Sequence, residues 1–163
     1  MMKIKIAGLE NGKHMFEFSG EIDKNELTEP LIGEYNTKVV LNKFDDQIIL
    51  EASTLAAANF SCDRCGIEYN RDIESKYKMI YLLRGDSEEE EINIKYLSPD
   101  ADKIDIESDV RDYLILSIPM KNLCKEDCKG LCFKCGQDLN IGVCKCNDDE
   151  VDDRWKALSD LKF

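Results

Sequence analysis

Eight cysteines arranged in four short pairs constrain this chain more than any other feature of its sequence. Six of them lie in the run CKEDCKGLCFKCGQDLNIGVCKC, and two lie far upstream in SCDRCG. Isolated cysteines are often just small buried hydrophobic residues, but that role does not explain paired spacing in a polar, lysine-rich context. The four pairs are Cys62/Cys65, Cys124/Cys128, Cys132/Cys135 and Cys144/Cys146.

A structural zinc site is the interpretation that the downstream spacing favours. Two thiolates separated by two residues on a tight turn can both face a tetrahedral Zn²⁺ about 2.3 Å away. Gly136 directly follows one such pair and relaxes the backbone where the chain must curl around the ion. Because four protein ligands leave no open position for water, the predicted zinc is structural, not catalytic. The pattern CxxC-x8-CxC supplies these four ligands: Cys132, Cys135, Cys144 and Cys146.

The remaining four cysteines could form a second site that fastens the tail onto the body of the protein, giving one or two zinc ions in all. CxxxC is a looser pattern than CxxC, and its partner pair lies far away in the sequence. Another partition stays open, in which the upstream pair joins Cys132 and Cys135 and leaves some thiols free. The second predicted site comprises Cys62, Cys65, Cys124 and Cys128.

Three other uses of the thiols are weighed against zinc. An iron–sulfur cluster also takes four cysteinates, but no signature of an electron-transfer partner accompanies them. Thioredoxin-like chemistry places a CxxC in βαβ surroundings, which neither CxxC has. Structural disulfides are rare in the cytosol. We expect a cytoplasmic protein because the N-terminus lacks a signal-peptide core and no run approaches the roughly 18 apolar residues of a membrane span.

The first half of the chain alternates apolar and polar residues, which predicts antiparallel strands. TKVVLNKF and QIILEAS flank a predicted hairpin turn at Asp45 and Asp46, and RDIESKYKMIYLLRG continues the alternation. The upstream CxxC is therefore expected in a turn between two strands. Core candidates on the two strands of the hairpin are Val39, Leu41, Ile48 and Leu50.

Helical spacing appears only in the second half. SDVRDYLILSIP predicts a helix near 108–118, with Ser108 as its N-cap, Pro119 as its end, and Val110, Leu114 and Leu116 in its apolar stripe. GDSEEEE reads as a solvated loop, and VDDRWKALSDLKF as a short closing helix. The sequence thus predicts an α+β protein, with an antiparallel β-rich body over residues 1–120 and a cysteine-rich metal-binding tail over residues 121–163.

The charge balance bears on function. The chain has 22 basic and 34 acidic residues, a net charge of −12, whereas domains that bind nucleic acid unaided are usually basic. A basic protein is therefore the better first partner than naked RNA, and direct RNA binding stays undecided. His14 is the only histidine, no nucleophile motif lies near it, and neither a Walker A sequence nor GxGxxG occurs. Nothing in the sequence supports an enzyme.

The tail resembles a known family. The runs LSIPMKNLC, CKGLCFKCGQDLN, CKC and DDRWKALSDL are similar to the end of bacterial and plastid YceD proteins, and FSCDRCGIEY is similar to the CxRC segment of that family. Phe133 stands where the family usually has proline, and Asp153 stands where a proline precedes the arginine. Some family members lack the tail cysteines, so metal binding is not the sole carrier of the family's function.

The resemblance implies a non-enzymatic factor in ribosome biogenesis that supports accumulation of large-subunit ribosomal RNA. Its implied partner is a basic ribosomal protein or a pre-ribosomal large-subunit particle. The cysteine spacing alone would equally support a zinc-stabilised adaptor unconnected with ribosomes, and less well an iron–sulfur redox protein.

Overall fold

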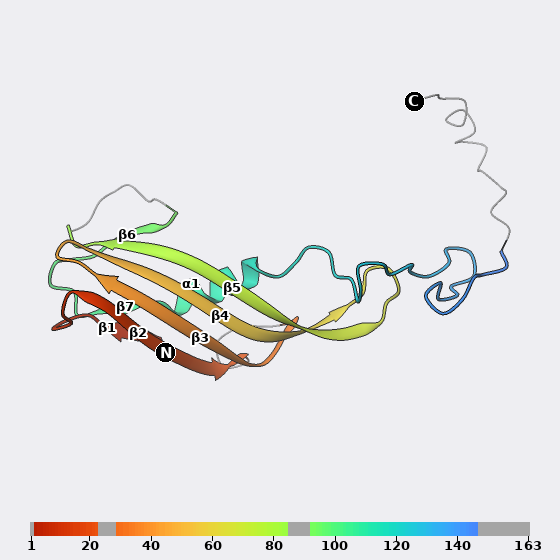
Figure 1. The fold of residues 1–163 in the computed structure, drawn as a ribbon, viewed down its shortest axis with the longest axis horizontal. Helices are drawn as coiled ribbons and strands as arrows, with labels where there is room; N and C mark the ends of the chain where they lie inside the picture. Colours follow the sequence, from red (N-terminus) through yellow and green to blue (C-terminus); the bar gives the residue numbers. More distant parts are fainter. Residues whose placement is uncertain (1, 23–28, 85–91, 147–163) are drawn as a thin grey trace, which may run out of the picture.

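The protein is an elongated molecule in which a long twisted sheet leads into the cysteine-rich segment at one end (Figure 1). This computed structural model describes residues 2–22, 29–84 and 92–146. Within them lie β1 (Lys3–Lys5), β2 (Gly12–Glu21), β3 (Leu31–Lys43), β4 (Gln47–Ser61), β5 (Glu68–Leu82), β6 (Ile94–Tyr96), β7 (Lys103–Asp105) and α1 (Glu107–Leu116). The predicted closing helix and the acidic loop both fall on residues outside these ranges.

The main sheet has the strand order β2-β3-β4-β5-β6. Consecutive hairpins join β2 to β5, and the predicted turn at Asp45 and Asp46 is confirmed between β3 and β4. Strands β4 and β5 pair antiparallel along their full 15-residue lengths. Their far ends carry the chain to the upstream CxxC, which lies in the turn between them as predicted.

The last strand corrects the prediction of a purely antiparallel body. β6 runs parallel to β5, with Ile80 opposite Ile94. A tight hairpin can join only antiparallel neighbours, whereas a longer connection brings the chain back to run in the same direction. Residues 83–93 make that longer connection. The alternation of apolar residues does not encode strand direction, so the sequence pattern had no signal for this pairing.

One face of the main sheet forms the core. The four predicted core residues of the β3–β4 hairpin are buried, each at most 1% exposed. Helix α1 packs against β4 and β5, and the small β1–β7 sheet, with Ile4 opposite Ile104, adds further buried residues to the same cluster. Full burial of each such aliphatic side chain stabilises the fold by about 1.5–3 kcal/mol.

Helix α1 begins and ends differently from the prediction. It starts at Glu107, so Ser108 lies inside the first turn and its assignment as N-cap is wrong. Ile106 occupies the cap position without a side-chain hydrogen bond, and the Asp105 carboxylate accepts a hydrogen bond from the Glu107 N–H instead, at 3.1 Å. Asp105, two residues before the start of the helix, thus accepts the kind of backbone hydrogen bond expected of a serine N-cap.

The helix ends at Leu116, three residues before Pro119, and the Ser117 hydroxyl donates to the Tyr113 carbonyl oxygen at 2.7 Å. Val110 and Leu114 are buried as predicted, but Leu116 is 78% exposed. The apolar stripe is therefore narrower than its sequence suggests. The described part of the chain contains no helix long and apolar enough to cross a membrane.

A partly buried ion pair connects α1 to the edge of the sheet. The Lys95 ammonium of β6 lies 2.6 and 2.7 Å from the two carboxylate oxygens of Asp109, whose residue is only 8% exposed. The Tyr81 hydroxyl donates to the same carboxylate at 3.5 Å. Nearby, the rings of Tyr77 and Tyr113 stack with centroids 4.5 Å apart. These contacts fix the helix whose C-terminal end leads to the cysteine-rich segment.

Candidate metal centres

The structure gathers the eight cysteines into two groups of four. In each group the four Sγ atoms all lie within 4.8 Å of one another. The group that joins the sheet to the tail is termed here the clasp site, and the group within the tail the tail site. The clasp site comprises Cys62, Cys65, Cys124 and Cys128, and the tail site comprises Cys132, Cys135, Cys144 and Cys146.

The sulfur spacing in the clasp site matches a single tetrahedral ion. The Sγ atoms of Cys62 and Cys128 are 3.8 Å apart, and those of Cys65 and Cys124 are 3.7 Å apart. Four sulfurs each about 2.3 Å from Zn²⁺ form a tetrahedron with edges of about 3.8 Å. An iron–sulfur cluster would hold its thiolates further apart, because the inorganic core occupies the space between them. Four thiolates at this spacing fit one zinc-like ion.

The two CxxC pairs lie on separate loops that share the same hydrogen-bond pattern. In the upstream loop the Gly66 N–H donates to the Cys62 carbonyl and the Cys62 N–H donates to the Ile67 carbonyl, at 2.8 and 2.9 Å. In the downstream loop the Gly136 N–H and the Cys132 N–H make the equivalent bonds, each 2.8 Å long. Both glycines have φ of +72°, a left-handed conformation that glycine adopts without strain. The two sites are thus built on one repeated unit.

Backbone hydrogen bonds tie the upstream loop to the tail around the clasp site. The Asp63 N–H donates to the Asn122 carbonyl at 2.8 Å, and the Asn122 N–H donates back to the Asp63 carboxylate at 2.6 Å. The Leu131 N–H donates to the Arg64 carbonyl at 3.1 Å. Residues about 60 positions apart in the chain are therefore held together by protein contacts as well as by the four sulfurs.

Gly130 allows the closest of these approaches. Its φ is +77°, and a Cβ atom built on it would lie 2.9 Å from the Arg64 carbonyl oxygen. Any other residue would strain the backbone and push the tail away from the loop. The glycine of CKGLC thus sets the distance at which the tail meets the upstream CxxC.

Hydrogen bonding from the loops favours a thiolate in each site. The backbone N–H of Cys124, aided by those of Arg64 and Cys65, lowers the pKa of the Cys62 thiol to about 6. The backbone N–H groups of Cys135 and Lys134 lower the pKa of Cys132 to about 7. Metal ligation requires the thiolate form, so each site holds one thiol that ionises more readily than an ordinary cysteine.

Other thiols in the two sites resist ionisation. Burial raises the pKa of Cys124 to about 12, and hydrogen bonding with Cys135, followed by burial, raises that of Cys146 to about 12. Four crowded sulfurs repel one another when all are ionised, and a bound divalent cation would remove that repulsion. Metal binding would therefore displace protons from these thiols.

The two sites differ in their shielding. Cys62 and Cys128 of the clasp site are buried between the sheet end and the tail, whereas Cys135 of the tail site is exposed. Phe133, next to a tail-site ligand, is 84% exposed. A metal at the clasp site would therefore be less accessible to a chelator than one at the tail site.

The sequence singled out all eight cysteines, and the structure joins the upstream pair to Cys124 and Cys128 rather than to Cys132 and Cys135. Metal binding itself stays a prediction. The sequence does not predict the supporting contacts of Asn122 and Gly130, because these contacts depend on residues that only the fold brings together. Arg64, which also supports the clasp site, lies between two of its ligands in the CxRC segment noted in the sequence.

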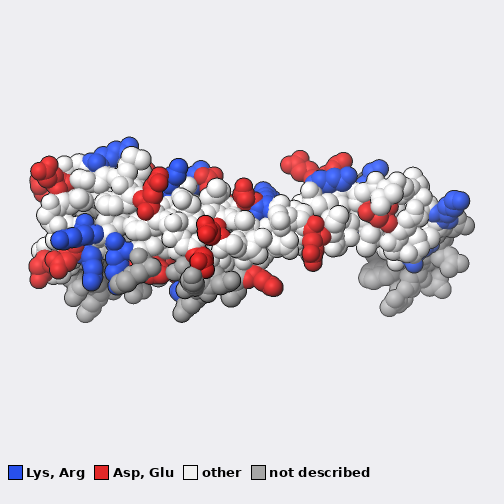
Figure 2. All heavy atoms as spheres, turned by 90° about the horizontal axis from the view of Figure 1, so that it is seen from below, with Lys and Arg blue, Asp and Glu red and all other residues white. Residues whose placement is uncertain are grey.

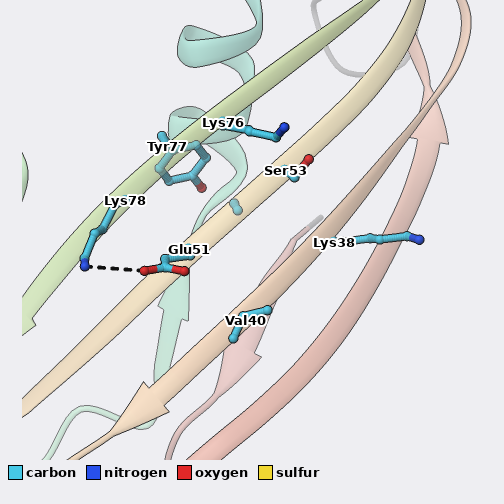
Figure 3. A pocket seen from close by; sticks show the side chains of 8 residues that line it. Lys38, Val40, Glu51, Ser53, Lys76, Tyr77 and Lys78 are labelled. Atoms are coloured by element: carbon cyan, nitrogen blue, oxygen red, sulfur yellow. Dashed lines mark ion pairs between the residues drawn. The ribbon is translucent and has the colours of Figure 1, made fainter.

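A shallow hollow of about 490 Å³ lies on the opposite face of the main sheet, over the middle of β3, β4 and β5. Figure 3 shows the lysines around it, with the Lys78 ammonium paired to the Glu51 carboxylate at 3.3 Å. Lys76 is likewise paired, to Glu74 at 2.7 Å. Since two of its three lysines are paired with acidic side chains, the hollow is not a concentrated anion-binding site.

A curved, mostly antiparallel sheet, a covering helix and two four-thiol sites that could hold metal ions define a small protein whose cysteine-rich tail is clasped to one end of the sheet. The chain belongs to the YceD family, because the family model described as "Large ribosomal RNA subunit accumulation protein YceD" matches residues 50–162. The matched region contains most of β4, all of β5 and α1, and all eight cysteines. The resemblance drawn from the sequence is thus confirmed.

Curated relatives agree with this assignment over shorter stretches. The chain is 36% identical over 67 residues to "Large ribosomal RNA subunit accumulation protein YCED homolog 1, chloroplastic" of Arabidopsis thaliana, covering 41% of this chain and 21% of that protein. It is 42% identical over 66 residues to the Zea mays protein of the same description, covering 39% and 21%. An uncharacterised protein of Mycobacterium leprae is 33% identical over 58 residues, covering 36% and 26%.

These alignments span about a fifth to a quarter of the relatives' own lengths. No solved structure matches the chain significantly.

Proposed function

We propose that this protein is a non-enzymatic factor that supports accumulation of large-subunit ribosomal RNA, acting on an assembling particle in the cytoplasm. The observation that carries the proposal is the family match over residues 50–162, which includes β5, most of β4, helix α1 and the described tail. The names of the two plant relatives support the same process.

The two four-thiol sites serve this role by holding the tail in shape. The tail around the cysteines has few buried apolar side chains, and Met120, Phe133, Ile141 and Val143 are each more than 80% exposed. A structural zinc ion contributes on the order of 10 kcal/mol to folding in small zinc peptides. Zinc at both sites would therefore supply the stability that the tail's own hydrophobic contacts do not.

A basic ribosomal protein is the proposed direct partner. The chain carries a net charge of −12, and acidic and basic side chains are interspersed on the face seen in Figure 2, without a continuous basic surface. RNA binding draws its affinity from contiguous lysines and arginines that neutralise phosphates. Electrostatic attraction instead favours a positively charged protein.

Depletion of the protein in its own organism tests the role. We expect a fall in the ratio of large-subunit to small-subunit ribosomal RNA and a loss of large subunits in sucrose gradients, both restored by the wild-type gene. Restoration by the double variant Cys62→Ser/Cys124→Ser should be weaker, since it opens the clasp site. Unchanged rRNA ratios after complete depletion would contradict the proposal.

Metal analysis of purified protein, with no added affinity tag, tests the cofactor separately. Two zinc ions per chain would support the assignment of both sites. Bound iron with visible absorbance would contradict the zinc assignment and favour a redox protein. A lack of bound metal after anaerobic purification would refute the structural-metal role and leave the ribosomal role intact.

A further inference from the structure

Asn140 lies in the loop between two tail-site ligands but contacts the clasp site. Its side-chain amide Nδ2 donates to the Cys128 Sγ at 3.5 Å, and its Oδ1 accepts a hydrogen bond from the Lys129 N–H at 2.9 Å. One side chain therefore touches both a clasp-site sulfur and the backbone immediately after it. It connects the loop of the tail site to a ligand of the clasp site.

Asn140 is held in place by the hairpin of the tail site. The Asp138 carboxylate accepts hydrogen bonds from the Asn140 N–H and from its Nδ2, at 2.8 and 2.7 Å. Leu131 and Asp138 form an isolated antiparallel bridge, and the Leu139 N–H donates to the Gly130 carbonyl at 2.9 Å. The amide is thus aimed at Cys128 by a hairpin whose two arms also carry the tail-site cysteines.

We propose that Asn140 couples the two sites, so that a metal ion in the tail site raises the affinity of the clasp site. This inference rests on the metal binding proposed above. A tail-site ion would draw the two arms of the hairpin together and fix Asn140, whose N–H then stabilises the Cys128 thiolate. Groups that hydrogen-bond to metal ligands typically change metal affinity by about 10–100-fold. Because coupling between binding sites is reciprocal, a clasp-site ion raises tail-site affinity by the same factor.

A merely local role for Asn140 would have a different consequence. If its side chain only stabilised the hairpin through Asp138, then its removal would weaken the tail site and leave the clasp site unchanged. The contact with Cys128 is what distinguishes the two roles. Each site must therefore be followed separately while metal is added to the whole chain.

Site-resolved thiol protection provides that measurement. Reduced, metal-free full-length protein is titrated with Zn²⁺ in a competing chelator, pulsed with N-ethylmaleimide, and digested for mass spectrometry. Protection of Cys62 and Cys65 reports the clasp site, and protection of Cys144 and Cys146 reports the tail site. The variants are Asn140→Ala, the double variant Cys132→Ser/Cys135→Ser, which disables the tail site, and the combination of all three changes.

We expect Asn140→Ala to lower clasp-site affinity about tenfold and the double variant to lower it by at least as much. Adding Asn140→Ala to the double variant should cause little further loss, because the amide is no longer held in place.

Gln137→Ala is the matched control. It changes an exposed side chain in the same loop and retains the carbonyl that accepts the Cys132 N–H, so both affinities should stay within about twofold of wild type.

Two results would overturn the coupling. If Asn140→Ala and the double variant both leave clasp-site affinity unchanged, then the sites bind independently and only this inference fails. If Zn²⁺ protects neither set of cysteines in wild-type protein, then the inference fails together with the proposed metal binding. The ribosomal role is tested independently by depletion and does not depend on either result.

Discussion

The Arg64 guanidinium donates a hydrogen bond from Nη1 to the Cys128 carbonyl oxygen at 2.5 Å, joining the CxRC loop to the tail by a contact separate from the sulfurs. A charged donor to a partly buried carbonyl contributes about 1.5–3 kcal/mol. We therefore expect Arg64→Ala to loosen the clasp and speed loss of Zn²⁺ from the clasp site to a chelator. Lysine at this position should restore part of the loss, since it keeps the charge but not the planar array of donors.

Release of Zn²⁺, followed with a colorimetric chelator, measures this effect. Arg71→Ala is the control, because Arg71 is exposed on β5 outside the clasp. Equal release rates from wild type and Arg64→Ala would show that this hydrogen bond does not help to hold the tail.

Gly130→Ala should destabilise the clasp more than Gly136→Ala. Both positions have positive φ, +77° and +72°, so both substitutions carry a similar backbone strain of about 1–2 kcal/mol. Only at Gly130 would the new Cβ also approach the Arg64 carbonyl oxygen to 2.9 Å, whereas nothing lies within 4 Å of the Cβ position at Gly136. The difference between the variants isolates the close approach.

Thermal unfolding of zinc-loaded protein gives the comparison. We expect Gly130→Ala to unfold at a lower temperature than Gly136→Ala and to lose clasp-site protection first. The opposite order would mean that the tail can move away from the upstream loop at little cost.

Metal removal should loosen the tail and leave the sheet intact. The core is built from buried aliphatic and aromatic residues, most of them in β1, β3, β4, β5, β7 and α1, and it includes none of the eight cysteines. Treatment with EDTA and a reductant is therefore expected to increase proteolysis within residues 121–146 several-fold while circular dichroism of the sheet is retained. Cooperative loss of sheet signal on chelation would instead show that the clasp supports the whole fold.

The sequence allowed the sheet to be predicted well where burial alternates along one strand, as in β4, where Ile48, Leu50 and Ala52 are all buried. It failed where backbone geometry depends on distant partners. Ser108 has the chemistry of an N-cap, but the cap position lies two residues earlier, at Ile106, where the pairing of β7 makes Asp105 available as acceptor. The parallel pairing of β6 with β5 likewise depends on a partner strand that the local sequence does not identify.

The metal centres show the same division. Cysteine spacing identified the eight candidate ligands because the geometry of a CxxC loop is local. The residues that support those ligands act across long stretches of sequence: Asn140 and Arg64 lie 12 and 64 positions from Cys128, which both contact. Such contacts leave no periodic pattern in the sequence, so only the fold reveals them.

Asp109→Asn should lower stability by about 2 kcal/mol, because it removes the charge that pairs with Lys95 and accepts from Tyr81 in a largely buried position. Asp112→Asn on the same helix is the control. Its side chain is 60% exposed and pairs with the neighbouring Arg111 at 3.3 Å, so its effect should fall within about 0.5 kcal/mol. Urea unfolding at pH 7 measures both, and equal values would show that the Lys95–Asp109 pair contributes no net stability.

Alkaline pH should unfold the protein through Tyr77 and Tyr81. Burial, with the nearby Asp109 carboxylate, raises the pKa of both phenols well above the usual value, which is about 10 in an unfolded chain. A group whose pKa is raised in the folded state contributes its full stability below the unfolded pKa and loses it as pH rises. Above about pH 10, the two tyrosines together should therefore reduce the free energy of unfolding by up to about 2.7 kcal/mol per pH unit.

Tyr77→Phe separates this effect from the titration of other groups. The Tyr77 hydroxyl is buried and has no hydrogen-bond partner among the residues that the structure describes, so its removal should leave stability at pH 7 unchanged or slightly higher. Between pH 10 and 11, wild type loses stability through both phenols, whereas the variant keeps only Tyr81. The loss from these phenols should therefore be about half as large in the variant. Urea unfolding across this range gives the comparison. Identical pH slopes for the two proteins would mean that Tyr77 reaches solvent before the core unfolds.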